Sequence, residues 1–181
     1  MTDGTRGEIA AGAAGLPVRN TARIILADGL DRILLFRFVF VGPDTRPPDD
    51  IWWGTPGGGV DEGESLPQAA ARELFEETGL RVQQDRFDRI VARNRGVARF
   101  NGAELWFENH YYFLRAQAER FELDASGWQE IERASIAEHR WWSAADLAAT
   151  AAVIHPPGLA RILPDLLAGR LPEQPLDVGW A

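Results

Sequence analysis

The stretch from Pro56 to Leu80, PGGGVDEGESLPQAAARELFEETGL, decides how the rest of the chain can be interpreted. Its second half carries the signals of a helix. Ser65, followed three positions later by Gln68, forms a capping-box pattern, and the residues that follow are strong helix formers. Gly79 supplies the end, because glycine readily adopts the left-handed conformation that closes a helix. We therefore predict a helix that begins near Ser65 and stops at Gly79.

The predicted helix has one acidic face. At about 100° per residue, Glu73, Glu76 and Glu77 share one side, and Leu74 lies opposite. Three carboxylates on adjacent turns repel one another unless a cation lies among them. The helical wheel puts no Lys or Arg on that side and places Arg72 outside it. Oxygen ligands suit a hard divalent cation, so this face predicts a Mg²⁺ or Mn²⁺ site.

Three glycines, Gly57 to Gly59, come just before the helix. Without side chains the backbone can bend close to a ligand, so we expect one of the glycine carbonyls to face the same ion. A solvated amphipathic helix without function is the ordinary alternative for an isolated run of glutamates. The glycines and the full spacing favour the metal site.

This spacing resembles the Nudix box. Gly58 is followed after five residues by Glu64 and, after seven more, by a run from Arg72 to Leu80. Together they fit the pattern G-x5-E-x7-R-E-U-x-E-E-x-G-U, in which U is a bulky aliphatic residue. The resemblance implies a Nudix hydrolase in which Gly58, Glu64 and Arg72 form the scaffold of the box and Arg72 pairs with Glu64.

The resemblance also implies the roles of the acidic residues. The metal ligands are expected to be Gly57, Glu73, Glu76 and Glu77, and the catalytic residues within the box Glu76 and Glu77. The implied reaction is hydrolysis of a diphosphate linkage in a nucleoside diphosphate linked to another moiety, by attack of water on phosphorus. The substrate stays open among nucleotide sugars, nucleoside triphosphates and other diphosphates.

Two competing functions belong to other classes. The first is a Nudix-like module that senses a nucleotide without turnover. Such domains can lose their catalytic glutamates, whereas this chain has them all. The second is the isoprenoid diphosphate isomerase branch of the superfamily, where a cysteine takes part in proton transfer. This chain has no cysteine, which disfavours the isomerase.

A general base outside the helix is a further requirement. If cations occupy all three helix carboxylates, their basicity is low. Some Nudix enzymes supply the base from a loop beyond the last long strand, which here spans residues 126–140. The carboxylates of that loop are Glu130, Glu132 and Glu138, and we predict Glu132. If none of the three serves, the base lies within the box, at Glu76 or Glu64.

Four other side chains are candidates for contacting a substrate. Trp52 can stack on a base or sugar, and His110 can line a cleft. Arg37 and Arg23 can bind phosphate. Each has an ordinary structural alternative: a core tryptophan, a buried hydrogen-bonded histidine and solvated arginines. For both arginines we expect the outward-facing, solvated side chain.

The rest of the chain predicts strands on both sides of the helix. Residues 19–27 and 32–40 are β-branched and aromatic runs joined by a tight turn. Residues 86–100 and 103–116 flank Asn101-Gly102, a strong hairpin signal. The sequence predicts irregular structure for residues 122–140. Ser143 is the expected N-cap of a helix through Thr150, and a second helix is expected at residues 158–168.

This order of elements indicates an α+β fold in one domain. The resemblance makes it a Nudix-like α/β/α sandwich with a mixed β-sheet between helices. We place the domain at residues 18–170, after a flexible lead-in of residues 1–17 and before an extended tail of residues 171–181. Trp180, in that tail, is a candidate to pack on the body of the domain.

Composition limits partners and location. The chain has 181 residues and no cysteine, which excludes disulfides, thiolate metal sites and a thiol nucleophile. A net charge of −8 argues against binding a nucleic-acid duplex or an anionic membrane, and no apolar run approaches a membrane span. We therefore expect a soluble, cytoplasmic protein that acts on a small molecule, with a homodimer left open.

Overall fold

The computed structural model describes residues 15–39, 51–100, 102–116, 123–124 and 135–180. The strands in these residues are β1 (Val18–Ala27), β2 (Arg32–Val39), β3 (Ile51–Gly54), β4 (Gly57–Gly59), β5 (Ile90–Phe100), β6 (Ala103–Arg115), β7 (Ile136–Ser143), β8 (Ile154–His155) and β9 (Leu176–Asp177). The helices are α1 (Leu66–Thr78), α3 (Ala144–Ala149), α4 (Leu159–Leu167) and the 3-10 turn η1 (Gln84–Arg86). None of the helices in the described segments is long and apolar enough to cross a membrane.

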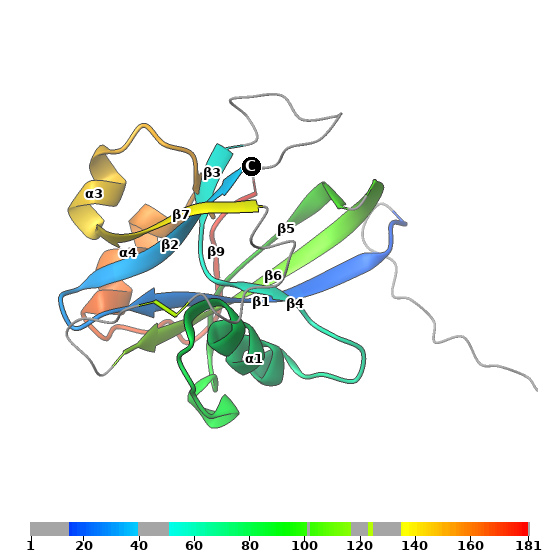
Figure 1. Ribbon diagram of the computed structural model, residues 1–181, viewed down its shortest axis with the longest axis horizontal. Helices are drawn as coiled ribbons and strands as arrows, with labels where there is room; N and C mark the ends of the chain where they lie inside the picture. Colours follow the sequence, from blue (N-terminus) through cyan, green and yellow to red (C-terminus); the bar gives the residue numbers. More distant parts are fainter. Residues whose placement is uncertain (1–14, 40–50, 101, 117–122, 125–134, 181) are drawn as a thin grey trace, which may run out of the picture.

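The strands form one mixed sheet in the order β8-β3-β2-β1-β6-β5-β9, with β4 added to β1 and β7 added to β2. β1 and β6 run parallel through the middle, and the β5–β6 hairpin is antiparallel. In Figure 1, α1 lies below the strands, while α3 and α4 lie at the left end of the sheet, beside β2. This is the α+β arrangement of a mixed sheet between helices that the sequence predicts.

Helix α1 begins and ends where the sequence predicts. The Ser65 hydroxyl accepts a hydrogen bond from the Gln68 N–H, and the Gln68 side chain accepts one from the Ser65 N–H at 2.8 Å. At the other end, Gly79 has a left-handed φ of 76° and its N–H donates to the Phe75 carbonyl. The capping box and the glycine stop therefore fix the register of the acidic face.

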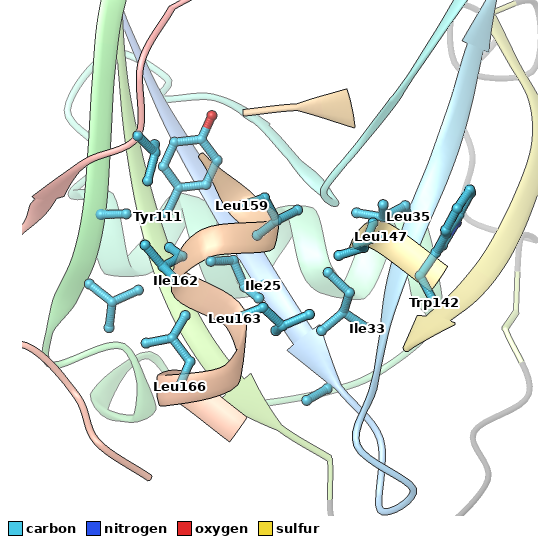
Figure 2. Packing of buried hydrophobic residues seen from close by; sticks show 14 of the residues in the cluster. Ile25, Ile33, Leu35, Tyr111, Trp142, Leu147, Leu159, Ile162, Leu163 and Leu166 are labelled. Atoms are coloured by element: carbon cyan, nitrogen blue, oxygen red, sulfur yellow. The ribbon is translucent and has the colours of Figure 1, made fainter. Parts of the chain in front are cut away.

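Strand β1 alternates between two hydrophobic cores. Ile24 and Leu26 pack with Leu74 of α1 on one face of the sheet. Ile25 and Ala27 belong to the core on the other face, where Figure 2 shows α4 packed over β1. The side chains that α4 contributes are Leu159, Ile162, Leu163 and Leu166. Each fully buried leucine contributes about 2 kcal/mol through its removal from water.

The sheet divides along β1, and that division positions the box. Near their turn, β1 and β2 pair with Ala27 opposite Ile33. Towards its start, β1 pairs instead with β4, so that Thr21 lies opposite Gly59 and Arg23 opposite Gly57. The glycines before α1 are therefore part of the sheet and carry the N-terminal side of the box onto the central strand.

Two predicted boundaries are wrong. Arg86, expected in a strand, ends η1, and β5 begins at Ile90. Residues 122–140, expected to be irregular, include the start of β7, which pairs antiparallel with β2. The polar residues between Ile136 and Trp142 hide the alternation, so the pairing with β2 decides the strand where local propensity does not.

Candidate active site

A cavity of about 830 Å³ crosses the central strands, a volume typical of sites for small molecules. Thr21 and Arg23 of β1 line it together with Asn109 and Tyr111 of β6. The box contributes Gly57, Gly58, Gly59, Arg72, Glu73 and Glu77 to its lining. The acidic helix and the central strands therefore share one cavity.

Strand β4 consists only of glycine, and this composition lets the carboxylates of α1 come close to the backbone. A Cβ atom at Gly58 would lie 2.5 to 2.7 Å from the three carboxyl atoms of Glu73. Gly57 has a φ of 115°, and its N–H donates to Glu77 Oε2 at 2.6 Å. A larger residue at Gly58 would have to displace the carboxylate of Glu73 from this position.

Two of the helix carboxylates are buried. The exposed fraction is 7% for Glu73 and 3% for Glu77. Burial raises the pKa of Glu73, and the nearby Arg72 and Arg23 guanidinium groups offset only part of that rise. A carboxylate that has lost its water gains from any cation that comes into contact with it.

Arg72 lies among the carboxylates, which corrects the prediction that no arginine is on that side. Its Nε and Nη2 donate to the two carboxylate oxygens of Glu64 at 2.9 and 2.8 Å. Its Nη1 lies 2.9 Å from Glu73 Oε1 and 3.3 Å from Glu76 Oε2. The helical wheel gives the direction of Cβ only, whereas a long side chain reaches neighbours one and four positions on. The expected pairing of Arg72 with Glu64 is present.

The acidic residues supply the type of ligand atom, oxygen, that suits a divalent cation. Within the described part of the chain, no three acidic or imidazole side chains already converge as a metal site. Glu73 and Glu76 are held by Arg72, and the Gly57 carbonyl accepts a hydrogen bond from Arg23 Nη1. Carboxylate and carbonyl oxygens are nevertheless the ligands that Mg²⁺ and Mn²⁺ prefer.

Two arginines of β1 line the cavity, and for Arg23 this corrects the expectation of a solvated side chain. The Arg23 guanidinium donates to the carbonyls of Thr55 and Gly57. Arg19 lies with its guanidinium carbon 4.2 Å from the centroid of the Phe100 ring, and burial lowers its pKa. The period of two that puts Arg19 and Arg23 on one face of β1 is visible in the sequence; the direction of that face is not.

Of the four candidate substrate residues, Trp52 and Arg23 line the cavity. The Trp52 ring stacks on Phe38 at 4.4 Å and meets the edge of His155 at 5.1 Å. His155, which no sequence pattern singles out, also lines the cavity. Burial, followed by the charge of Arg23, lowers its pKa, so the imidazole is neutral near pH 7.

Arg37 and His110 do not line this cavity. Arg37 Nε donates to Glu138 Oε2 at 2.9 Å, in an ion pair open to solvent. His110 Nδ1 lies 3.3 Å from the Thr21 carbonyl oxygen. Phe38 of β2 and Asn109 and Tyr111 of β6 line the cavity, and strand alternation turns the adjacent Arg37 and His110 away from it. Of the proposed bases outside the box, Glu138 is in this ion pair, while Glu130 and Glu132 lie outside the described residues.

Comparison with known proteins identifies the family. The model of the NUDIX domain matches residues 17–166. The chain is 41% identical over 70 residues to the RNA pyrophosphohydrolase of Novosphingobium aromaticivorans, covering 39% of this chain and 40% of that protein. Its identity to the RNA pyrophosphohydrolase of Sphingopyxis alaskensis is 30% over 122 residues, covering 60% of this chain and 70% of that protein. The first of these alignments spans only about two fifths of the relative's length.

Solved structures give the same fold. The MutT NUDIX hydrolase from Burkholderia pseudomallei superposes with a TM-score of 0.53 at 22% identity, over 81% of this chain and 95% of that one. A NUDIX hydrolase from Nitrosomonas europaea gives a TM-score of 0.52 at 22% identity, over 84% and 90%. At these identities the likeness shows the fold alone.

The Glu64–Arg72 pair predicts a pH-dependent contribution to stability. Hydrogen bonding to Arg72 lowers the pKa of Glu64 in the folded chain. A lowered folded pKa means that the contribution is complete above the unfolded value of about 4.3 and disappears as the pH falls through the folded value. In excess chelator, Glu64→Gln should therefore lower the free energy of unfolding by about 1 kcal/mol at pH 7. Urea unfolding at pH 7 and below pH 4 measures the difference, which should shrink at the lower pH.

The matched control is Glu62→Gln, because Glu62 is an exposed residue of the same loop. It should leave the free energy of unfolding nearly unchanged at both pH values. Equal losses in the two variants would show that the loop tolerates neither change and that the ion pair with Arg72 is not the cause.

Proposed function

The chain belongs to the Nudix family, and from that membership together with the site we propose that it hydrolyses a diphosphate linkage in a nucleoside diphosphate linked to another moiety. The observation that carries this proposal is the pair of buried carboxylates, Glu73 and Glu77, held beside an all-glycine strand at the edge of an 830 Å³ cavity. Burying two carboxylates costs stability, which is a reason to look for a function that uses them.

In this proposal a divalent cation, Mg²⁺ or Mn²⁺, is held by Glu73, Glu76, Glu77 and the Gly57 carbonyl. When bound, it neutralises the diphosphate and lowers the pKa of the attacking water. Arg72 has a divided role, since Nε and Nη2 hold Glu64 while Nη1 neutralises Glu73 and Glu76. If the hydrogen bonds from Nη1 break, Glu73 and Glu76 are free to bind the cation. The ion pair of Arg72 with Glu64, which holds the loop to the helix, stays intact.

Arg23 and Arg19 would orient the phosphates. Both residues line the cavity, and Arg23 donates to the Gly57 carbonyl, so its guanidinium lies beside the box. Guanidinium is the side chain best suited to two-point contacts with phosphate oxygens. These arginines place positive charge locally in a chain whose net charge is −8.

RNA is a second candidate substrate, because the curated relatives are named RNA pyrophosphohydrolases. An RNA carries a diphosphate linkage only at an end with more than one phosphate, so the same hydrolysis would apply there. Four arginines line the cavity, Arg19, Arg23, Arg72 and Arg99, and their positive charge is compatible with such an end. The nucleotide-sensing module remains the alternative without turnover.

The test is a hydrolysis panel of nucleotide sugars, dinucleoside polyphosphates, nucleoside triphosphates and a short 5′-triphosphorylated RNA, with the products resolved by ion-exchange chromatography. We expect turnover of at least one class with Mg²⁺ or Mn²⁺, its loss in excess EDTA and its return when the metal is restored. Full turnover in excess EDTA would contradict the metal-dependent reaction. Tight binding of a nucleotide without turnover on any member of the panel would favour the sensing module.

Glu77→Gln is the matched test of the carboxylates. Replacing a buried ligand that needs its charge should lower kcat by about 100-fold or more, while the folded helix is retained because a repulsion is removed. Glu104→Gln, at an exposed position of β6, should keep the wild-type kcat. Loss of the thermal transition in Glu77→Gln would instead make Glu77 a structural residue.

The general base is tested by three substitutions within residues 126–140. We expect Glu132→Gln to lose most of kcat, by about 10²- to 10⁴-fold, together with the acidic limb of the pH–rate profile, while still binding Mn²⁺. Glu130→Gln and Glu138→Gln serve as matched controls and should keep both. If all three variants retain wild-type rates, the base lies in the box, at Glu76 or Glu64.

A further inference from the structure

The segment that follows α4 returns to the sheet and lies along β5. Strand β9 pairs with β5 in parallel, and the Val178 N–H then donates to the Arg93 carbonyl at 3.1 Å. The Val178 carbonyl accepts from the Gly158 N–H at 2.8 Å, and the Val178 side chain is buried. Backbone hydrogen bonds on two sides therefore fix the position of residues 176–180 on the domain.

The indole of Trp180 packs against Gly96 of β5, which has no side chain. A Cβ atom at Gly96 would lie 2.4 to 2.5 Å from three indole atoms, so only glycine leaves room for the ring there. Val97 and Ala98 line the cavity, as does Trp180, whereas Gly96 does not, which is consistent with the indole covering it. Phe107, opposite Gly96 on β6, has its ring centroid 6.1 Å from that of Trp180. Trp180 and Phe107 thus form one aromatic wall of the cavity.

A chain of polar side chains ties this wall to the central strand. The Thr21 hydroxyl donates to Asn109 Oδ1 at 2.6 Å, and Asn109 Nδ2 donates to Asn94 Oδ1 at 2.9 Å. Asn94 Nδ2 donates to the Gly179 carbonyl at 2.6 Å, next to Trp180. All three side chains are buried and line the cavity. A buried and satisfied network of this kind holds its members in one arrangement.

Trp52 and the aromatic wall of Trp180 and Phe107 lie on opposite sides of the box. Trp52 belongs to β3, on the β2 side of β1, whereas Trp180 stands on β5, on the β6 side. The glycine strand and the carboxylates lie between them, against β1. A diphosphate placed at the carboxylates can therefore extend a ring towards β5, past the guanidinium of Arg19.

We propose that Trp180 is a specificity-determining residue, and that its indole stacks on the planar base of a nucleoside diphosphate whose phosphates lie at the box carboxylates. Gly96 and Asn94 are positioning residues that act through Trp180. The inference rests on the proposed function and deepens it, because it assigns the base to the β5 side of the cavity. Stacking on a flat indole tolerates any base, so it selects for a ring and not for a sequence.

The test compares two unreactive probes in the presence of Mg²⁺, by calorimetry. Methylene-bridged ADP carries a base, and methylenediphosphonate has the same phosphorus–carbon–phosphorus group without one. Trp180→Ala should weaken binding of methylene-bridged ADP by about tenfold and leave methylenediphosphonate unchanged, while Trp180→Phe should retain most of the affinity. Gly96→Ala, which displaces the indole, should act in the same direction and add little when combined with Trp180→Ala.

The matched control is Trp106→Ala. Trp106 is half-buried on β6, is not among the residues that line the cavity and donates to Glu108, so this variant should bind both probes as the wild type does. Wild-type affinity of Trp180→Ala for methylene-bridged ADP would overturn the inference and leave the proposed function standing. Tighter binding would also overturn it, because the indole would then occupy space that the base needs.

Two other outcomes separate the remaining possibilities. Equal losses for both probes in Trp180→Ala would show a structural role for the tail and overturn the stacking role. A wild-type chain that binds neither probe would overturn the proposed function and the inference with it.

Discussion

The close contact between buried carboxylates and a strand without side chains is the constraint on which the site depends. Gly57 donates its N–H to Glu77, and Gly58 lies where any Cβ would collide with the Glu73 carboxylate. The same glycines pair with β1, so one short strand joins the acidic helix to the centre of the sheet. The capping box and Gly79 set where α1 begins and ends, so that Glu73 and Glu77 of the helix lie against this strand. Fold and site are therefore positioned by the same few residues.

The electrostatics follow from that contact. Buried carboxylates with little access to water need positive charge, and for Glu73 it comes from Arg72 and, more distantly, from Arg23. Arg72 divides its donors between Glu64, which ties the loop to the helix, and the carboxylates of the helix itself. Nothing covalent is required of the protein in the proposed reaction. Its contribution is to hold charge at fixed points in a cavity partly shielded from water.

Much of this could be predicted from the sequence, because the signals are local. The helix from Ser65 to Gly79 and the turn at Gly102 rest on caps and glycines, and both are present. Contacts that depend on side-chain length or on pairing between distant segments could not be predicted. Arg72 reached the carboxylates despite its place on the helical wheel, β7 formed by pairing with β2, and Trp180 joined the cavity because residues 176–180 return to β5. Arg37 and His110 face away from the cavity. Strand alternation is visible in the sequence, but the direction in which each face of a strand points is not.

Mn²⁺ binding by Gly58→Ala measures whether the glycine strand positions the carboxylates for a cation. The added methyl group must displace Glu73, whereas in Gly59→Ala it meets only the flexible end of Arg19. Titration of free Mn²⁺ by electron paramagnetic resonance should show an affinity about 10- to 100-fold weaker in Gly58→Ala, with Gly59→Ala close to the wild type and both variants folded. Wild-type Mn²⁺ affinity in folded Gly58→Ala would show that the glycine strand does not position the carboxylates for a cation.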